Sequence, residues 1–444
     1  MQTFVVQKKE IIGRLDPYYN LPKFKDLYKL LKERPYSLST LRKESKSIFS
    51  GTTPLSGGDA YTYTIQNGIP FIRSGDFSEE NEIDFSKVVY IKHDVHNGKM
   101  RSSQLCKGDL LIAIVGATIG KIGVYKYDRE ANINQAICSV RLKDLNPFYV
   151  QAFYQTNIGQ LLIEHIKRPV ARANINLEEV GGLPIPIVSV TLQQKIVDIQ
   201  EKAFQSKEKK ENEAIEILQS IDDYILSELG IKCPTFARTE NGRFFYTSFH
   251  DLMGSEWAPL CIKNNGRRSK STLYKEVKLS TLATITKGQA ITSKEIVSGN
   301  YPVIAGGQSS PYSHNQYNYK GNIITISASG AYSGYVWYHN YPIFASDCSA
   351  IFSNEENIYL TKYIYEILRL RQQEIYLLQK GAGQPHVYPS DIANLTIPAI
   401  PWEKQQEIVA YCQKLRNKAE LLQKEGHDII STAKETIEQM IIGN

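Results

Sequence analysis

The chain carries one long pattern twice, and this duplication restricts its fold more than any other feature. The segment GDLLIAIVGATIGKI at 108–122 returns as GNIITISASGAYSGYV at 321–336. The segments at 182–186 and 192–197 return at 394–398 and 404–409, so that both echoes are offset by 212 to 214 residues. A long period that is repeated once indicates two copies of a whole domain, not a short-repeat solenoid.

The 444 residues are enough for two or three domains of ordinary size. The predicted units are a first domain at 1–188, a first long helix at 189–232, a second domain at 233–400 and a second long helix at 401–444. Each unit therefore consists of a globular domain followed by one long helix.

The N-terminal ends of the two domains echo more weakly. The sequence LSTL stands at 38–41 and again at 279–282, an offset of 241. Because this offset exceeds that of the later echoes, the first domain is expected to carry about thirty extra residues in surface loops, where insertions are tolerated.

The local signals within each domain are mostly those of strands. Short β-branched runs bounded by glycine are typical of buried strands. Such runs occur at 69–72, 110–115, 301–304 and 323–326. Asn146 and Pro147 open a predicted helix at 148–166, since proline is tolerated in a first helical turn, and 359–379 is its counterpart. The predicted fold class is α+β, with two similar mixed α/β domains and mainly antiparallel or strongly curved sheets.

Each predicted long helix has one narrow apolar stripe, so each needs a partner. We expect the two helices to pack antiparallel as a coiled coil that separates the domains. The segment SKEKKENE at 206–213 interrupts the first stripe and is expected to be solvated. A continuous helix over 192–229 would be about 57 Å long. The residues that we assign to the helix seam and to subunit docking are Ile196, Ile199, Leu218, Ile221, Leu415 and Leu422.

Composition argues for a binding protein in the cytoplasm. No apolar run approaches the about 20 residues that span a bilayer, and 1–10 lack a secretory pattern. The six cysteines form no CxxC pair, so neither a zinc site nor a disulfide framework is predicted. Phosphate-loop, methyl-donor and nuclease motifs are missing, and no cofactor or metal is expected in this chain. His93 and His96 are spaced like metal ligands, but without further ligands nearby a solvated loop is expected.

Several features fit contact with nucleic acid. Between 261 and 294 stand eight basic residues and one acidic residue, which form either a phosphate footprint or a solvated, flexible strand. Gly116, Gly120, Gly330 and Gly334 follow matched strands and either admit a phosphate or make an internally packed turn. The aromatic side chains at 332, 335, 337 and 338 either stack on bases or join the core.

Arginine can pair with guanine, and asparagine or glutamine with adenine, through two hydrogen bonds. The candidate DNA-binding residues chosen on these grounds are Arg73, Lys121, Arg168, Arg172, Asn174, Arg267, Arg268, Lys287, Gln289, Lys294, Gln308, Tyr332, Gln384 and His386. For each of them, a solvated surface position is the alternative.

The duplicated segments resemble the specificity subunit of type I restriction–modification systems. The resemblance is carried by 107–123, 321–336 and 381–398, and by the exits IPIVSVTLQQKIV and IPAIPWEKQQEIV. It implies a non-catalytic subunit in which two target-recognition domains each read half of a split duplex DNA target. The two helices would fix the gap and dock two modification (methyltransferase) subunits. S-adenosylmethionine, ATP and Mg would belong to these and to restriction/translocase subunits.

Other readings remain open from the residues alone. The segments GRLDPYY at 13–19 and SEWAPL at 255–260 resemble prefixes of specificity modules that work with other methylase types. The chain could therefore serve a related methylation-based defence system. It could also be a protein-bridging coiled-coil scaffold without DNA readout, or an enzyme with an unfamiliar site. Steep salt dependence of binding would favour DNA over a protein ligand.

Overall fold

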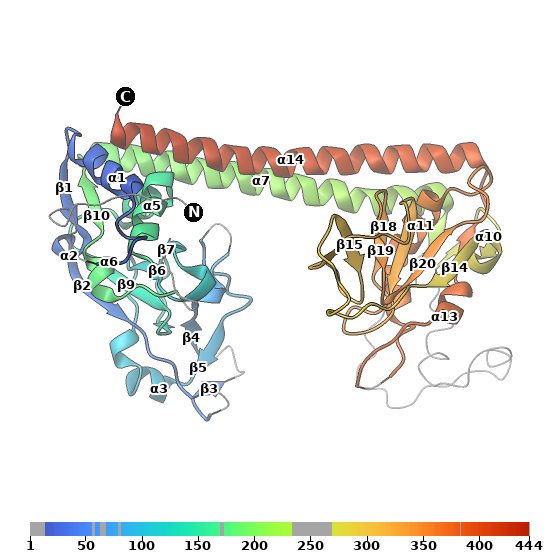
Figure 1. Ribbon diagram of the computed structural model, residues 1–444, viewed down its shortest axis with the longest axis horizontal. Coiled ribbons are helices and arrows are strands. Elements are labelled where there is room, and N and C mark those ends of the chain that lie inside the picture. Colours follow the sequence, from blue (N-terminus) through green and yellow to red (C-terminus); the bar gives the residue numbers. More distant parts are fainter. Residues whose placement is uncertain are drawn as a thin grey trace. The chain divides into compact units, whose positions relative to one another are not determined.

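The computed structural model describes residues 14–55, 58–62, 68–78, 81–168, 173–232, 269–381 and 383–443. The chain divides into two compact units. Unit 1 comprises Met1–Glu211 and Gln423–Asn444, and unit 2 comprises Asn212–Leu422. Figure 1 labels their helices and strands. Among the described residues, no helix is long and apolar enough to cross a membrane.

Each unit is built on an antiparallel sheet of four strands in the same order. In unit 1 the order is β2(Ser45–Ser50), β9(Ile137–Leu142), β6(Leu110–Ala113) and β7(Ile122–Val124). In unit 2 it is β14(Ala283–Lys287), β20(Cys348–Ser353), β17(Ile323–Ser327) and β18(Val336–His339). The predicted mixed α/β class is thereby confirmed, and both echoing segments form the same strand pair.

A second sheet in each unit contains one parallel pair. In unit 1 its order is β3(Tyr61–Thr62), β5(Val89–Ile91), β4(Ile69–Ile72) and β8(Asn132–Ile133). In unit 2 it is β16(Ser313–His314), β15(Tyr301–Ile304) and β19(Phe344–Ala345). The parallel pairs are β4·β8 and β15·β19. Extra elements of unit 1, namely β3, α3(His93–Asn97) and the 3-10 turn η4(Arg101–Ser103), lie between β2 and β6.

Entry and exit of each unit are joined as an antiparallel pair. β1(Ser37–Thr40) pairs with β10(Pro184–Ile187), and β13(Glu276–Lys278) pairs with β21(Thr396–Pro398). Leu41 begins α2(Leu41–Glu44) and donates its N–H to Leu183 O; Leu279 begins α10(Leu279–Leu282) and donates to Leu395 O. Leu41 and Leu279 are thus equivalent, at an offset of 238. The predicted offset of 241 was wrong, because it matched letters three positions out of structural register.

Two predicted helices are each split. The helix expected at 148–166 is α4(Pro147–Gln155) followed by α5(Asn157–Ile166). Thr156 between them is extended, and its side chain accepts the N–H of Gly159. The helix expected at 359–379 is α11(Thr361–Leu370) followed by α12(Gln372–Tyr376). The sequence does not reveal either break, because the apolar stripe continues from the first helix into the second. At Thr156 the same residue ends α4 and caps α5.

The two long helices are α7(Val190–Leu229) and α14(Trp402–Ile442). Within unit 1, Ile196 shares an apolar core with Ile437 and Ile441. Within unit 2, Ile221 shares one with Ile408. There, Lys418 pairs with Glu213 and Lys404 with Glu228, at 3.6 and 2.5 Å, which shows that the helix segments of unit 2 run antiparallel.

The solvated interruption predicted at 206–213 is wrong in one respect. α7 continues through it, and Lys207 is only 4% exposed. Its stem passes close to Gly426 of α14, where an added Cβ would lie 3.2 Å from Lys207 Cγ. Lysine can bury its methylene stem while its ammonium keeps a polar partner, here Glu211 at 3.1 Å.

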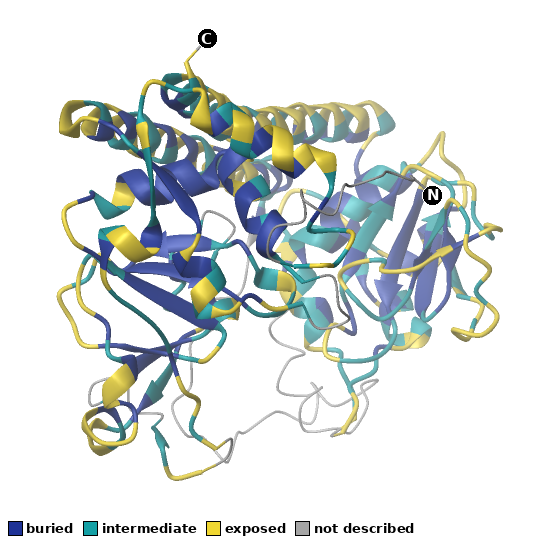
Figure 2. Ribbon diagram, turned by 60° about the vertical axis from the view of Figure 1, so that its left-hand side comes forward, coloured by how far each residue is buried: buried dark blue, intermediate teal, exposed yellow. Residues whose placement is uncertain are grey.

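Helices cover one side of each main sheet and complete its core. α4 and α5 lie over unit 1, where Tyr149 and Phe153 are buried, and α11 lies over unit 2, where Tyr363 is buried. Figure 2 shows the buried residues gathered in the strands and on the inner faces of the helices. The remaining described helices are α1(Pro22–Lys32), α6(Leu177–Gly181) and α13(Pro389–Ala393).

Candidate nucleic-acid interface

In unit 2, three segments that are distant in sequence meet beside the strand pair β17·β18. The first is the turn at 305–308, the second the glycine loop at 328–335, and the third the extended stretch at 384–388. Ser329 bridges to His386, and Gly330 N–H donates to Pro385 O at 3.1 Å. The Ser327 hydroxyl donates to Gly307 O at 3.3 Å. Four candidates, Gln308, Tyr332, Gln384 and His386, therefore come from one group of loops.

Unit 1 repeats this arrangement. Its segments are the turn at 73–78, the loop at 114–121 and the stretch at 173–176. Val115 bridges to Asn174, and Gly116 N–H donates to Ala173 O at 3.0 Å. Lys121 Nζ donates to Phe77 O and Ser78 O at 3.0 and 3.1 Å. We call this arrangement of three segments, present in both units, the three-segment site.

The glycine loops are alike in backbone conformation. Gly116 and Gly330 have φ of +78° and +86°, and Gly120 and Gly334 both have +94°, values that glycine adopts without a Cβ clash. Gln160 donates to Gly120 O and Gln372 to Gly334 O, at 3.1 and 2.8 Å. At this second glycine the internally packed turn is the observed arrangement, whereas a Cβ at Gly116 would meet no atom within 4 Å.

Arg73, Lys121 and Arg168, the candidate cations of unit 1 that the structure describes, already have partners. Arg73 donates Nε and Nη2 to the carboxylate of Asp76, at 3.2 and 2.9 Å, and Asp76 is 2% exposed. Arg168 pairs with Glu179 at 3.1 Å, and Lys121 points into backbone carbonyls. The sequence did not reveal these contacts, which tie each of the three side chains to another residue of unit 1. Asn174 is exposed.

The remaining candidates of unit 2 lie at different distances from the site. Lys287 is the last residue of β14 and is exposed, and Gln289 N–H donates to Ala345 O at 2.9 Å. This places both next to 345–348, whose Asp347 accepts a hydrogen bond from Ser329. Lys294 is exposed in the following loop. Arg172, Arg267 and Arg268 lie outside the described residues.

Two aromatic side chains stand at the rim of the unit 2 site. Tyr332 is 48% exposed. Tyr388, also 48% exposed, was not predicted; its ring lies 6.1 Å from that of His386 at an interplanar angle of 23°. The signal for it is the alternation in 386–388, which puts both rings on one side of an extended chain. Trp337 and Tyr338 pack against core clusters, so the core reading holds for them.

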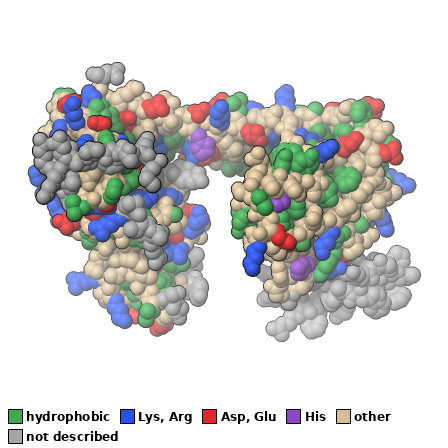
Figure 3. All heavy atoms as spheres, viewed as in Figure 1, with side chains coloured by type: hydrophobic (Ala, Val, Ile, Leu, Met, Phe, Trp, Pro, Cys, Tyr) green, Lys and Arg blue, Asp and Glu red, His purple; other side chains and the backbone are tan. Residues whose placement is uncertain are grey.

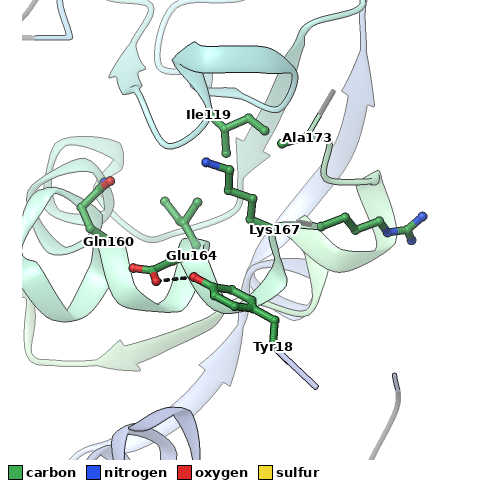
Figure 4. Close-up of a pocket in the computed structure, with 8 residues that line it drawn as sticks. Tyr18, Ile119, Gln160, Glu164, Lys167 and Ala173 are labelled. Atoms are coloured by element: carbon green, nitrogen blue, oxygen red, sulfur yellow. Dashed lines mark hydrogen bonds between the residues drawn. The ribbon is translucent and has the colours of Figure 1, made fainter. Parts of the chain in front are cut away.

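A cavity of about 610 Å³ opens beside Asn174 in unit 1 (Figure 4). Tyr18, Ile119, Glu164 and Lys167 are among its lining residues. Tyr18 donates to Glu164, and Lys23 pairs with the same carboxylate at 2.7 Å. These hydrogen bonds, Lys23's first, lower the pKa of Glu164, while burial raises the pKa of Tyr18 to about 12. Both groups keep fixed protonation at neutral pH, which suits a structural tie rather than acid–base chemistry.

The predicted solvated loop at His93–His96 is wrong. Both residues lie in α3, and His96 is 2% exposed. Its Nδ1 contacts Asn132 Oδ1 at 2.6 Å and its Nε2 contacts Gln104 at 3.0 Å. Within the part of the chain that the structure describes, no three His, Cys, Asp or Glu side chains are grouped to hold a metal ion.

Comparison with known proteins fits this duplicated site. The profile of the type I restriction modification DNA specificity domain matches residues 46–217 and 272–429. The chain belongs to this family. The two matched stretches contain the two three-segment sites, so the duplication is one of the family's domain.

A curated member of the family is the type I restriction enzyme EcoBI specificity subunit of Escherichia coli. It is 28% identical over 169 residues, which are 37% of this chain and 35% of that subunit. The matched region thus spans about a third of the length of this curated relative.

Two solved structures align with most of this chain. One, described as the structural basis underlying complex assembly and conformational transition of the type I R-M system, has a TM-score of 0.54 at 12% identity, over 92% of this chain and 98% of that one. The S subunit from M. genitalium gives 0.44 at 15% identity, over 94% and 99%.

The described residues on the visible face of each unit show no single basic patch (Figure 3). On the face shown in Figure 3, Lys and Arg side chains lie singly among uncharged ones in each unit. Arg73, Lys121 and Arg168 also have partners within the protein. The exposed amide and aromatic side chains are therefore the groups of the site that can contact a ligand without first breaking an ion pair.

Proposed function

We propose that this chain is the DNA-recognition subunit of a restriction–modification complex and binds a bipartite duplex target. The observation that carries the proposal is the repetition of the three-segment site in both units. Each unit would read one half of the target. Two sites of the same construction in one chain suit a ligand that presents two similar binding places, as duplex DNA does.

The exposed side chains of the site fit base reading. Gln308 and Gln384 of unit 2 and Asn174 of unit 1 are exposed, and a carboxamide can donate to one atom of adenine and accept from another. Tyr332 and Tyr388 offer flat apolar surfaces at the rim. Exposed lysines such as Lys287 would contact phosphates, which position a protein without reading sequence.

The long helices would form the spacer and the docking surface for two modification subunits. Forty residues in α7 correspond to about 60 Å of helix. In their own units Ile196 and Ile221 are at most 1% exposed and Leu422 is 8% exposed, whereas Leu218 is 36% exposed. We therefore assign the antiparallel seam to the buried residues and docking to the side of α7 that carries Leu218.

Catalysis would belong to the partners. Modification subunits would supply S-adenosylmethionine and methylate the target, and restriction subunits would use ATP and Mg. The family membership supports this division.

Modification-sensitive sequencing of genomic DNA, with and without the gene, tests the proposal. Loss of methylation at a split motif with a fixed gap is the expected result. Unchanged methylation, combined with no binding of the purified chain to duplex DNA, would contradict it. Binding should also weaken with salt, with a log–log slope of about −0.9 for each phosphate contact.

A further inference from the structure

Each long helix begins with the same buried glutamine. Gln193 is the fourth residue of α7 and Gln405 the fourth of α14. They are 6% and 0% exposed. A primary amide buried to this degree is stable only when its hydrogen bonds are made, so its contacts show what it holds.

The contacts of the two glutamines correspond. Asn146 N–H donates to Gln193 Oε1 at 3.0 Å, and Leu360 N–H donates to Gln405 Oε1 at 2.9 Å. Asn146 and Leu360 are the N-caps of α4 and α11. Each glutamine Nε2 donates at 3.1 Å to the carbonyl two residues before its helix, Val188 O or Ile400 O. One side chain thereby joins the long helix, the domain helix and the exit segment.

A tyrosine strengthens the same junction in both units. Tyr149, the third residue of α4, donates its hydroxyl to Pro186 O at 2.7 Å. Tyr363, the third residue of α11, donates to Pro398 O at 2.8 Å. Both rings are fully buried. Elsewhere the copies have diverged, as at Lys121 and Tyr335 after the glycine loops, yet at this junction they keep the same hydrogen bonds.

We propose that Gln193 and Gln405 are positioning residues that set the direction in which each long helix leaves its unit, and thereby the gap length that the protein accepts. This inference rests on the proposed bipartite DNA recognition. Apolar packing alone tolerates small rotations, whereas a buried amide that is tied through both its oxygen and its nitrogen favours one geometry.

The length of the helices makes small angles matter. Over the 40 residues of α7, about 60 Å, a tilt of about 4° moves the far end by about 4 Å. Successive base pairs of duplex DNA are about 3.4 Å apart along the helix axis. A loosened junction would thus let the protein accept a gap that is one base pair too long or too short.

The chain contains matched controls for this idea. Gln194 and Gln406 directly follow the two glutamines and are exposed. The test compares Gln193→Leu, Gln405→Leu and the double variant with Gln194→Leu and Gln406→Leu, all in the full chain. Each binds duplexes with the native gap and with gaps altered by one base pair, after the target is known from the wild type.

The expected result is a fall of about tenfold in the preference for the native gap over the altered gaps, with half-site sequence preference intact. Unchanged gap preference in folded variants, or an equal loss at all gaps, would overturn the inference. If the leucine variants do not fold, Tyr149→Phe and Tyr363→Phe remove the second tie with smaller disturbance and must relax the same preference. A wild type that binds no split duplex refutes the proposed function itself, which separates the two failures.

Discussion

Arg416 of α14 and Glu366 of α11 form a two-pronged ion pair inside unit 2, with both nitrogen–oxygen distances at 2.5 Å. The Glu366 side chain is 0% exposed and that of Arg416 18%. The equivalent positions of unit 1 by the repeat are Ala152 and Phe204, so this tie belongs to unit 2 alone.

Breaking this pair on one side should destabilise unit 2. Arg416→Ala leaves the buried carboxylate with Arg369, whose Nε lies 3.7 Å away, in place of the two-pronged pair; removing one partner of a buried pair costs about 3–5 kcal/mol. The double variant Glu366→Leu/Arg416→Met should recover most of the loss. Calorimetric unfolding measures both. Lys418→Met, which breaks an exposed pair with Glu213, is the control, and an equal effect there would refute the expectation.

Base-reading residues should change only one half of the target. Gln384→Ala in unit 2 should relax preference in one half-site by about 1–3 kcal/mol. Asn174→Ala in unit 1 should relax the other half. Binding to duplex libraries with one half randomised measures this. Lys287→Ala should weaken binding to all sequences alike, and a shift in both halves from Gln384→Ala would contradict the assignment.

Unit 2 should lose stability in mild acid because of His339. Burial lowers its pKa to about 4, and among the residues that the structure describes its Nδ1 has no hydrogen-bond partner. As pH falls from about 6.5 towards 4, the unfolded chain binds a proton that the folded unit does not, so stability falls by up to about 3 kcal/mol. His165 in unit 1, whose pKa burial also lowers, acts in the same direction.

Unfolding midpoints between pH 7 and pH 4.5 test this expectation. His339→Gln keeps a polar partner for Thr325, which now contacts Nε2 at 2.8 Å, and should flatten the pH dependence of unit 2. His427→Gln, at an exposed position, should leave the profile unchanged. An unaltered slope in His339→Gln would show that other groups dominate.

Substitutions at the helix seam should destabilise the protein, whereas a substitution at the docking surface should affect only the binding of modification subunits. Ile196→Asp or Leu415→Asp puts a carboxylate into an apolar core, at a cost of several kcal/mol, and should splay the helices and abolish assembly. Leu218→Asp should preserve the melting temperature but lose modification subunits. Native mass spectrometry gives the stoichiometry. Full assembly by Ile196→Asp would refute the seam.

The sequence was sufficient to predict those elements whose apolar residues follow the spacing of a strand or a helix. The duplication, the strands at 69–72, 301–304 and 323–326 and the two long helices follow from runs of apolar residues, and the described strands agree with them. The breaks at Thr156 and Arg371 were missed because the apolar stripe continues across them. The two LSTL segments are not structurally equivalent. The alignment of the two units is given by the strand pairs β1·β10 and β13·β21, and four identical residues were not enough to predict it.

The candidate site was predicted in outline rather than in detail. The glycine loops were named from the repeat, and Asn174 and His386 were named as candidate DNA-binding residues; the structure brings each loop next to one of these residues. That Arg73 is held by Asp76 was missed, because the contact forms only when 74–76 folds into a short 3-10 turn, which was not predicted. An arginine can therefore be proposed as a DNA contact only after the carboxylates that could bind its guanidinium within the protein are known.

The pairing of entry and exit strands, β1 with β10 and β13 with β21, has an evolutionary consequence. Because a unit opens and closes at adjacent strands, residues can be gained or exchanged between them without displacing the helix that follows. Unit 1 carries β3, α3 and η4 within that interval and keeps the same sheet order as unit 2. The interior of each unit can thus differ between the two copies while the strand pair that joins entry to exit is kept.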